Sequence, residues 1–194
     1  MNPLKSISGT IVLGFVTAII IALLIDAPGN AMWSLVVSLH VYFGIIWIGL
    51  LYYFNFVQVP AAATAAADTG GPGPAAISKY VAPLALLWFR WGALLTWLTG
   101  AAALEVAGWG FMNAFLLKSG TQVIGVGAWL GTIMLFNVWV LIWPNQKKIL
   151  GIVSATDEEK GKAKVVALMA SRTNTFLSIP MIMCMVGQMH GLPM

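Results

Sequence analysis

The sequence has 194 residues, of which 60% are hydrophobic and only 8% are charged, and its formal net charge is +4. This composition excludes a water-soluble globular domain, in which about 25% of residues are charged. The basic residues lie mostly in the segments between apolar stretches, so they indicate contact with anionic lipid and exclude a nucleic-acid partner. The sequence therefore predicts an integral protein of a lipid bilayer.

Five apolar stretches are long enough, or nearly so, to cross a hydrocarbon core of roughly 30 Å as helices of about 20 residues. We place these spans at residues 9–25, 32–58, 81–107, 121–143 and 173–192. The predicted fold is all-α, with residues 1–194 forming a single transmembrane domain, a bundle of five transmembrane helices. The first stretch resembles a signal peptide, and we treat it as an uncleaved first span.

The distribution of Lys and Arg decides the predicted orientation, because positively charged loops stay in the cytoplasm. With the N-terminus inside, most basic residues fall on the cytoplasmic side, namely Lys5, Lys79, Lys147, Lys148, Lys160, Lys162, Lys164 and Arg172. Only Lys118 falls outside. We therefore expect a cytoplasmic N-terminus and an extracytoplasmic C-terminus, in a multi-pass protein of the inner (plasma) membrane of a bacterium.

Residues 60–80 and 144–172 are the two predicted cytoplasmic loops. The first is rich in Ala, Gly and Pro, which favour an irregular connection. The second is polar, and Thr156 followed by Glu159 is typical of a capping box at the start of a helix. We expect the helix that begins there to continue into the fifth span.

The sequence contains two histidines, and both lie in apolar spans, where an ionisable side chain is costly and usually functional. His40 lies in the outer half of its span and His190 near the outer end of the last one. Gly44 and Gly187 each lie one turn from a histidine toward the membrane centre, where a flat macrocycle needs small neighbours, and Trp47 shares the face of His40. These residues predict a b-type haem whose iron is bound by both histidines, with the glycines and Trp47 around the cofactor.

Two alternatives to a haem stay open for the histidines. Either imidazole could instead hydrogen-bond a carbonyl or hydroxyl group of a neighbouring helix. A copper site is the second alternative, because thioethers and imidazole select Cu(I). However, Met181, Met185 and Met189 share one helix face while Met183 and His190 share another, so adaptable apolar packing accounts for most of these methionines.

Arg90 lies about nine residues into the span 81–107, so we expect its guanidinium near the middle of the hydrocarbon, where it needs polar partners. Polar side chains at comparable depth in other spans are Asn55, Gln58, Asn137, Asn174 and Ser178. An arginine surrounded by amides predicts a substrate site for an anion or a carbonyl compound. The alternative is a structural hub of hydrogen bonds that holds the helices together.

Several strings of the sequence resemble one family of membrane proteins. They are His40–Gln58 (HVYFGIIWIGLLYYFNFVQ), Phe89–Trp91, Trp129–Gly131, Phe136–Lys148 and Ala170–Pro180. These strings, which run from the second span to the fifth, resemble the membrane domain of the urate oxidase N-terminal (urate hydroxylase) family. The resemblance implies an all-helical membrane domain linked to urate oxidation, in a family whose longer members carry a C-terminal cytochrome c domain. More distantly, the early histidine in a WIG-type span is similar to haem-binding membrane proteins of the protoporphyrinogen oxidase type.

Cys184 is the single cysteine, and the sequence has no CxxCH motif, so the resemblance implies a short form without the cytochrome c domain. Three functions follow. The first is a membrane-embedded b-type haem protein for electron transfer or oxidoreduction, with a cytochrome c or a quinone as redox partner. The second is a urate-oxidising enzyme with a separate electron acceptor, in which Arg90 binds urate. The third is a non-catalytic helical subunit of a larger respiratory or oxygenase complex. We expect a homo-oligomer or a subunit of a membrane complex.

Overall fold

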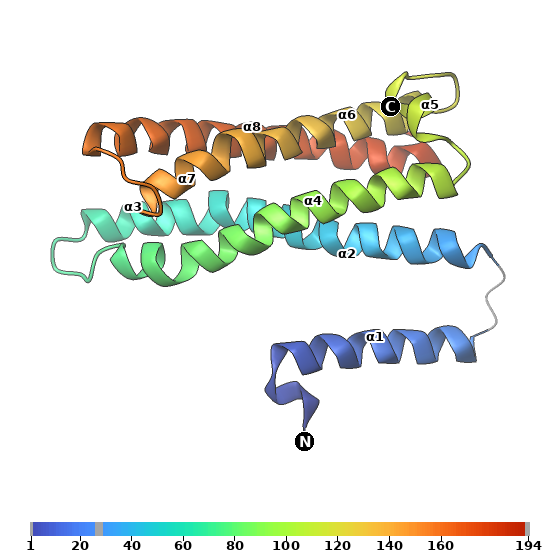
Figure 1. Cartoon of the computed structure of the whole chain (residues 1–194), viewed down its shortest axis with the longest axis horizontal. Helices are drawn as coiled ribbons and strands as arrows, with labels where there is room; N and C mark the ends of the chain where they lie inside the picture. Colours follow the sequence, from blue (N-terminus) through green and yellow to red (C-terminus); the bar gives the residue numbers. More distant parts are fainter. Residues whose placement is uncertain (1, 26–28, 193–194) are drawn as a thin grey trace.

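The computed structural model describes residues 2–25 and 29–192, and the regular elements in these ranges are helices (Figure 1). The α-helices are α1 (Ile7–Leu24), α2 (Ala31–Tyr53), α3 (Val59–Ala67), α4 (Ala82–Val106), α5 (Phe111–Phe115), α6 (Gln122–Phe136), α7 (Trp143–Ile149) and α8 (Asp157–His190). A short 3-10 helix, η1 (Pro3–Lys5), precedes them, and η2 (Phe54–Gln58), η3 (Ile77–Val81) and η4 (Asn137–Ile142) are π-helical.

Five continuous helical runs in the described part of the chain are long and apolar enough to cross a membrane. They are Ile7–Leu24, Ala31–Ala67, Ile77–Val106, Gln122–Ile149 and Asp157–His190. The predicted class, an all-helical multi-pass membrane protein with five candidate spans, is confirmed on these grounds. The last four runs are longer than the spans placed from hydropathy.

Residues 60–80 differ from the predicted loop, because much of the segment is helical. The chain continues from α2 through η2 and α3 to Ala67, and it becomes helical again around η3, which begins at Ile77. Alanine has the highest helix propensity, so the run of alanines after Pro60 extends the helix instead of ending it. The irregular connection is therefore the short Gly-rich and Pro-rich part alone.

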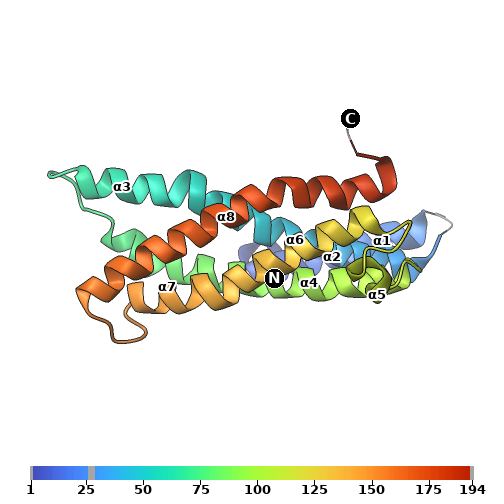
Figure 2. The same cartoon turned by 90° about the horizontal axis from the view of Figure 1, so that it is seen from above.

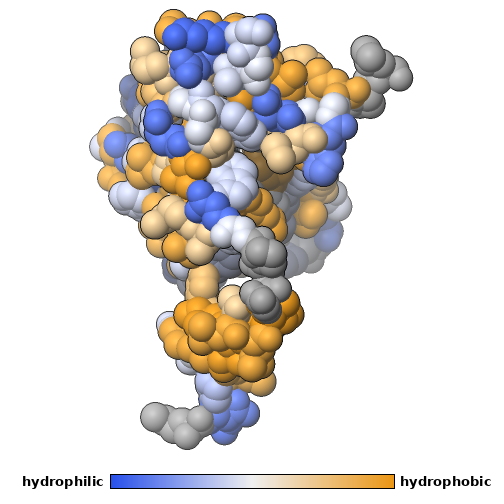
Figure 3. Space-filling view, turned by 90° about the vertical axis from the view of Figure 1, so that its right-hand side faces the viewer, coloured by the Kyte–Doolittle hydropathy of each residue, from blue (hydrophilic) through white to orange (hydrophobic). Residues whose placement is uncertain are grey.

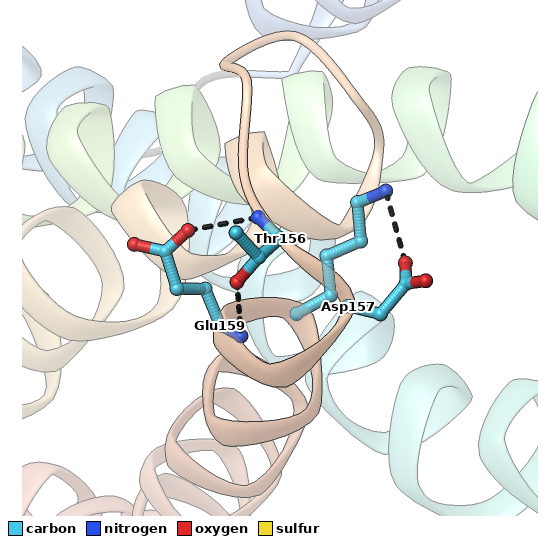
Figure 4. A network of polar contacts seen from close by, with 4 residues as sticks. Thr156, Asp157 and Glu159 are labelled. Carbon is cyan, nitrogen blue, oxygen red and sulfur yellow. Dashed lines mark hydrogen bonds and ion pairs between the residues drawn. The ribbon is translucent and has the colours of Figure 1, made fainter.

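The second predicted loop, 144–172, is also partly helical, since α7 extends to Ile149 and α8 begins at Asp157. The Thr156 hydroxyl accepts the backbone N–H of Glu159 at 3.2 Å, and the Glu159 carboxylate accepts the N–H of Thr156 at 2.8 Å (Figure 4). Asp157 adds an ion pair with Lys160 at 3.7 Å. The predicted helix start and its continuation into the fifth span are confirmed.

Each π-helical segment ends two residues before a proline: η2 before Pro60, η3 before Pro83 and η4 before Pro144. Proline donates no N–H, and its ring crowds the carbonyl group four residues back, so the regular hydrogen-bond pattern is interrupted there. A wider turn, in which the N–H of one residue bonds the carbonyl five residues back, relieves this conflict and lets the helix continue. The prolines therefore shape these long helices without ending them.

The main bundle consists of two helix pairs, α2 with α4 and α6 with α8, and the continuation of α6 through η4 and α7 also packs on α8 (Figures 1 and 2). Its core contains large buried side chains from all four chain segments, including Trp47, Leu51, Phe89, Met134, Val138 and Met181. The short helix α5 closes one end. Gly125 on α6 permits this closure, because a Cβ there would collide with the carbonyl group of Ala114 on α5.

Helix α1 lies beside the bundle and buries no residue. Its contact with α2 includes an edge-to-face pair of Phe15 and Tyr42, whose ring centroids are 5.8 Å apart. Seen from the end of the bundle, α1 forms a separate apolar lobe (Figure 3). A helix that is apolar on all sides and exposed in this way suits contact with lipid tails.

Candidate functional site

A cavity of about 300 Å³ lies at the α5 end of the bundle, between α2, α4, α5, α6 and α8. Its walls are mostly aromatic and apolar, with Trp33, Trp97, Trp109, Phe111, Phe115 and Met185 among the lining residues. Val41 on α2 and Val186 and Met189 on α8 also line it and are 51%, 54% and 65% exposed, so the cavity opens between these two helices. Its size is at the lower end of the roughly 300–1,000 Å³ usual for small-molecule and cofactor sites.

His40 on α2 lines this cavity. Its Nδ1 atom lies 2.8 Å from the backbone carbonyl oxygen of Thr96 on α4. A carbonyl group can only accept, so Nδ1 carries a proton and donates, and in the neutral imidazole Nε2 then has a free lone pair. A metal-ligating histidine makes the same contact, donating its other ring N–H to a carbonyl or carboxylate group. The structure therefore orients His40 as a ligand or as a hydrogen-bond acceptor.

Gly100 on α4 provides the space that the His40 ring occupies. A Cβ atom at Gly100 would lie 2.9 Å from His40 Cε1 and 3.0 Å from Nδ1, too close for any larger residue unless the ring moves. Thr96 lies one turn earlier on the same face. Sequence reasoning missed both residues, because nothing in the sequence states that this part of α4 faces His40.

Of the other predicted cofactor-site residues, Trp47 lies at the cavity and the two glycines do not. Trp47 is only 2% exposed, and its indole N–H has no hydrogen-bond partner among the residues that the structure describes. A Cβ added at Gly44 would lie 3.8 Å from Thr96 Cγ2, and one added at Gly187 would meet the Leu192 side chain. Neither glycine is among the residues that line the cavity, so their role beside a cofactor stays a prediction.

His190 is the last residue of α8, and its side chain is exposed. Helix α8 presents Met181, Met185, Val186 and Met189 to the cavity, whereas His190, one turn after Val186 at the helix end, is not among the lining residues. Gln188 fixes the rotation of α8, because its amide group makes hydrogen bonds of 3.1 Å and 2.9 Å to the start of α6. The structure thus brings Trp47 but not His190 to the cavity beside His40, and the bis-histidine pair stays a prediction.

The amides predicted to surround Arg90 bond to other groups. Asn137 donates to the side-chain oxygen of Asn174 at 2.8 Å, and Asn174 donates to the carbonyl group of Met134 at 2.9 Å. Asn174 is fully buried and Asn137 is 7% exposed. This pair joins the α6 and η4 segment to α8, which is the structural role that the sequence left open as the alternative.

A second set of polar contacts joins α2 and η2 to α8. Asn55 in η2 donates to the hydroxyl group of Ser171 at 2.8 Å. The hydroxyl group of Tyr52 lies 2.9 Å from that of Ser178, which itself donates to the carbonyl group of Thr175, so Tyr52 is the donor. These contacts tie α8 to both neighbouring chain segments in the half of the bundle opposite the cavity.

Arg90 on α4 lies apart from these amides, with its guanidinium carbon 3.8 Å from the centroid of the Trp143 ring. It is 106 − 90 = 16 residues from the end of α4 at Val106, about 24 Å along the helix at roughly 1.5 Å per residue. The guanidinium therefore lies well away from the α5 end of the bundle. The structure does not bring the predicted substrate residues Arg90, Asn55, Asn137 and Asn174 together, and their shared role stays a prediction.

The family model described as urate oxidase N-terminal matches residues 103–193. The match contains α5, α6, α7 and α8 and hence the methionine face of the cavity, whereas α2 with His40 precedes it. Comparisons with curated proteins and with solved structures found no match. Over residues 103–193, this chain is similar to a urate oxidase N-terminal domain, which confirms the resemblance for the strings from Trp129 onward, whereas the resemblance of His40–Gln58 and Phe89–Trp91 stays a prediction.

Proposed function

We propose that the protein is a membrane-embedded b-type haem protein for electron transfer or oxidoreduction, related to urate hydroxylase membrane domains. The observation that carries the proposal is the orientation of His40. Its Nδ1–H group is fixed on the Thr96 carbonyl oxygen at 2.8 Å, and the ring lines an apolar, aromatic cavity. An oriented neutral imidazole in such surroundings is a standard axial ligand of haem iron.

The residues around the cavity fit a haem. Aromatic rings from α2, α4 and α5 suit the faces and edges of a flat macrocycle, and the buried indole N–H of Trp47 is a donor with no partner among the described residues. The described residues contain no group of three His, Cys, Asp or Glu side chains that could hold a metal ion. A haem would not require one, because it would bring most of the ligands of its iron itself and would be held by His40 and a residue of α8.

We propose that α8 supplies the second axial ligand. The sequence predicts His190 for this role, and the structure presents the thioethers of Met185 and Met189 to the cavity. The two possibilities differ in chemistry, because methionine opposite histidine raises the reduction potential of the iron. They therefore give different spectra and potentials, which the experiment below separates.

A haem held here would supply a reversible one-electron centre. The contribution of the protein is to orient His40 through Thr96 and to keep water from the ring with apolar walls. We propose that the cavity end faces the extracytoplasmic side of a bacterial inner membrane, as the Lys and Arg distribution predicts. The opening between α2 and α8 admits a lipid-soluble partner such as a quinone, and a cytochrome c is the alternative partner at the membrane surface.

A pyridine haemochrome spectrum of the purified full chain tests the proposal. We expect a b-type signal in the wild type and a strong loss of haem in His40→Ala, because that change removes an axial bond. Added imidazole should restore haem binding in the variant, which separates loss of the ligand from loss of the fold. A wild-type protein with intact helices and no b-type signal would refute the haem proposal.

The second ligand is identified by comparing His190→Ala, Met185→Leu and Met189→Leu. If a methionine is the ligand, the ferric wild type shows a sulfur-to-iron charge-transfer band that only the corresponding leucine variant loses. If His190 is the ligand, that band is absent and His190→Ala alone reduces haem content. Retention of haem and of an unchanged spectrum in all three variants would show that α8 supplies no ligand.

A second candidate function is urate oxidation with a separate electron acceptor. The observation that favours it is the match of residues 103–193 to the urate oxidase N-terminal family. Urate consumption by the purified protein, with soluble one-electron acceptors and quinone analogues added in turn, tests this candidate. Absence of turnover with every acceptor, in protein that retains its haem, would leave electron transfer as the function.

A further inference from the structure

An open apolar groove of about 420 Å³ lies on the outer side of the bundle, between α4 and the segment formed by α6 and η4. Its lining residues include Leu94, Trp97 and Leu98 on α4 and Leu135, Phe136 and Trp139 opposite. Leu98 and Phe136 are 48% and 55% exposed, so the groove is open along its length. In a membrane, a long apolar groove of this kind is in contact with acyl chains.

Two cations and an indole ring lie beyond the α7 end of this groove. Trp91 packs edge-to-face on Trp139, with ring centroids 5.5 Å apart. Arg90, which precedes Trp91, lies over the ring of Trp143, and its guanidinium carbon is 3.8 Å from the ring centroid. Trp143 is one helical turn after Trp139. Lys147 Nζ lies 6.0 Å from the centroid of the same ring. Trp143 thus has a cationic group from α4 and another from its own helix.

Neither cation is neutralised within the part of the chain that the structure describes. The ion pairs found there join Lys160 with Asp157 and Lys162 with Glu158. An arginine that stacks its flat face on an indole keeps the N–H groups at its edge for an acceptor. Arg90 and Lys147 therefore offer positive charge and hydrogen-bond donors without an acidic partner.

The depth of these groups matches one membrane surface. Arg90 is 106 − 90 = 16 residues from the opposite end of α4 at Val106, or about 24 Å, and a long side chain adds several ångström toward the surface. The sum is close to the thickness of a hydrocarbon core of roughly 30 Å. With Val106 taken as the opposite surface, the guanidinium reaches the level at which lipid phosphates lie, and Trp143 takes the interfacial position that tryptophan favours.

We propose that Arg90, Trp143 and Lys147 bind the phosphate group of an anionic phospholipid whose acyl chain occupies the groove along Trp139. The cations supply charge complementarity, the groove supplies the apolar surface, and basic pockets at this level between transmembrane helices are known to hold anionic headgroups. The phosphate end of this site, at Arg90 and Trp143, is distant from His40, although Trp97 lines both the groove and the His40 cavity.

Native mass spectrometry of the full chain, released from micelles doped with phosphatidylglycerol or phosphatidylcholine, tests the proposal. We expect the wild type to retain phosphatidylglycerol in preference to phosphatidylcholine. Arg90→Gln should reduce that preference about fivefold, the change that one cation near a membrane surface contributes. Arg172→Gln, which removes an exposed arginine from α8, is the matched control and should leave the preference unchanged.

Two further arms keep the result decisive. Lys147→Gln should also reduce the preference for phosphatidylglycerol. This variant replaces Arg90→Gln if that protein does not fold. Soluble glycerol phosphate should not displace the lipid, since it lacks the acyl chain that fills the groove. Equal retention of both lipids by the wild type, or displacement of phosphatidylglycerol by urate at Arg90, would overturn the lipid site.

Discussion

The imidazole ring of His40 on α2 lies directly against Gly100 on α4. The position of an added Cβ at Gly100 is 2.9 Å from His40 Cε1, and the ring Nδ1 lies 2.8 Å from the Thr96 carbonyl oxygen. A hydrogen bond to Thr96 thus holds the His40 ring on one side, and on another side the ring packs against Gly100, which has no side chain. This relationship makes the orientation of His40 sensitive to a single methyl group.

Gly100→Ala should move the imidazole away from Thr96 and weaken haem binding by roughly 10- to 100-fold, the usual cost of disturbing the partner of a metal-ligating histidine. Haem titration of the apoprotein, followed by absorbance, measures this change. Gly49→Ala on α2 is the matched control, because a Cβ there meets no atom within 4 Å and Gly49 does not line the cavity. Equal haem affinity in the two variants would show that Gly100 does not position the ligand.

Asn174→Ala should lower the stability of the helix bundle without a direct effect on substrate binding. The change leaves the side chain of Asn137 without its acceptor, and an unsatisfied buried polar group costs about 1–3 kcal/mol. Thermal unfolding in detergent should therefore show a lower midpoint. Asn145→Ala is the control, because Asn145 bonds only within its own helix, to the Leu141 carbonyl oxygen. A normal midpoint with lost urate turnover would instead assign Asn174 to substrate binding.

Thr156→Ala should loosen the first turn of α8 by removing the hydroxyl that accepts the Glu159 N–H. Loss of such a cap typically costs about 1 kcal/mol. Amide hydrogen exchange at the start of α8 should become faster, while exchange in the buried part of the helix stays the same. Ser154→Ala, two residues earlier in the exposed loop, should leave the exchange rates as they are in the wild type.

The same helix start should depend on pH. Glu159 lies in the charged first turn of α8, well before the apolar part of the helix. Hydrogen bonds with the backbone N–H of Thr156 and then with its side chain hold the pKa of Glu159 below its usual value. Because the folded pKa is lowered, the stabilisation is fully present above the usual carboxyl pKa of about 4.3 and is lost as the pH falls through the lowered value.

Amide exchange of the first turn, compared between neutral and acidic solution, measures this loss. Glu159→Gln keeps an acceptor for the Thr156 N–H but does not titrate, so the exchange of the variant should change less with pH over the same range. An equal pH response in the two proteins would contradict a role for the Glu159 carboxylate.

Features that depend on neighbouring residues along the chain could be predicted from the sequence. Apolar runs long enough for a bilayer gave the five helices, and Thr156 with Glu159 gave the start of the last one, because hydropathy and capping are local properties. His40 was also identifiable, since an ionisable group in an apolar span is unusual wherever that span packs. The alanines after Pro60 were misjudged because a π-helical turn lets the helix pass the proline.

Which residues meet across helices could not be predicted from the sequence, because it depends on how the helices pack. Thr96 and Gly100 face His40 because α2 and α4 are antiparallel neighbours, and a glycine in a span does not state which side chain it admits. Equal depth suggested that Asn137 and Asn174 surround Arg90, yet rotation about each helix axis pairs the amides and turns Arg90 toward Trp143. Depth follows from position in the sequence, whereas rotation is set by packing, which depends on all the helices at once.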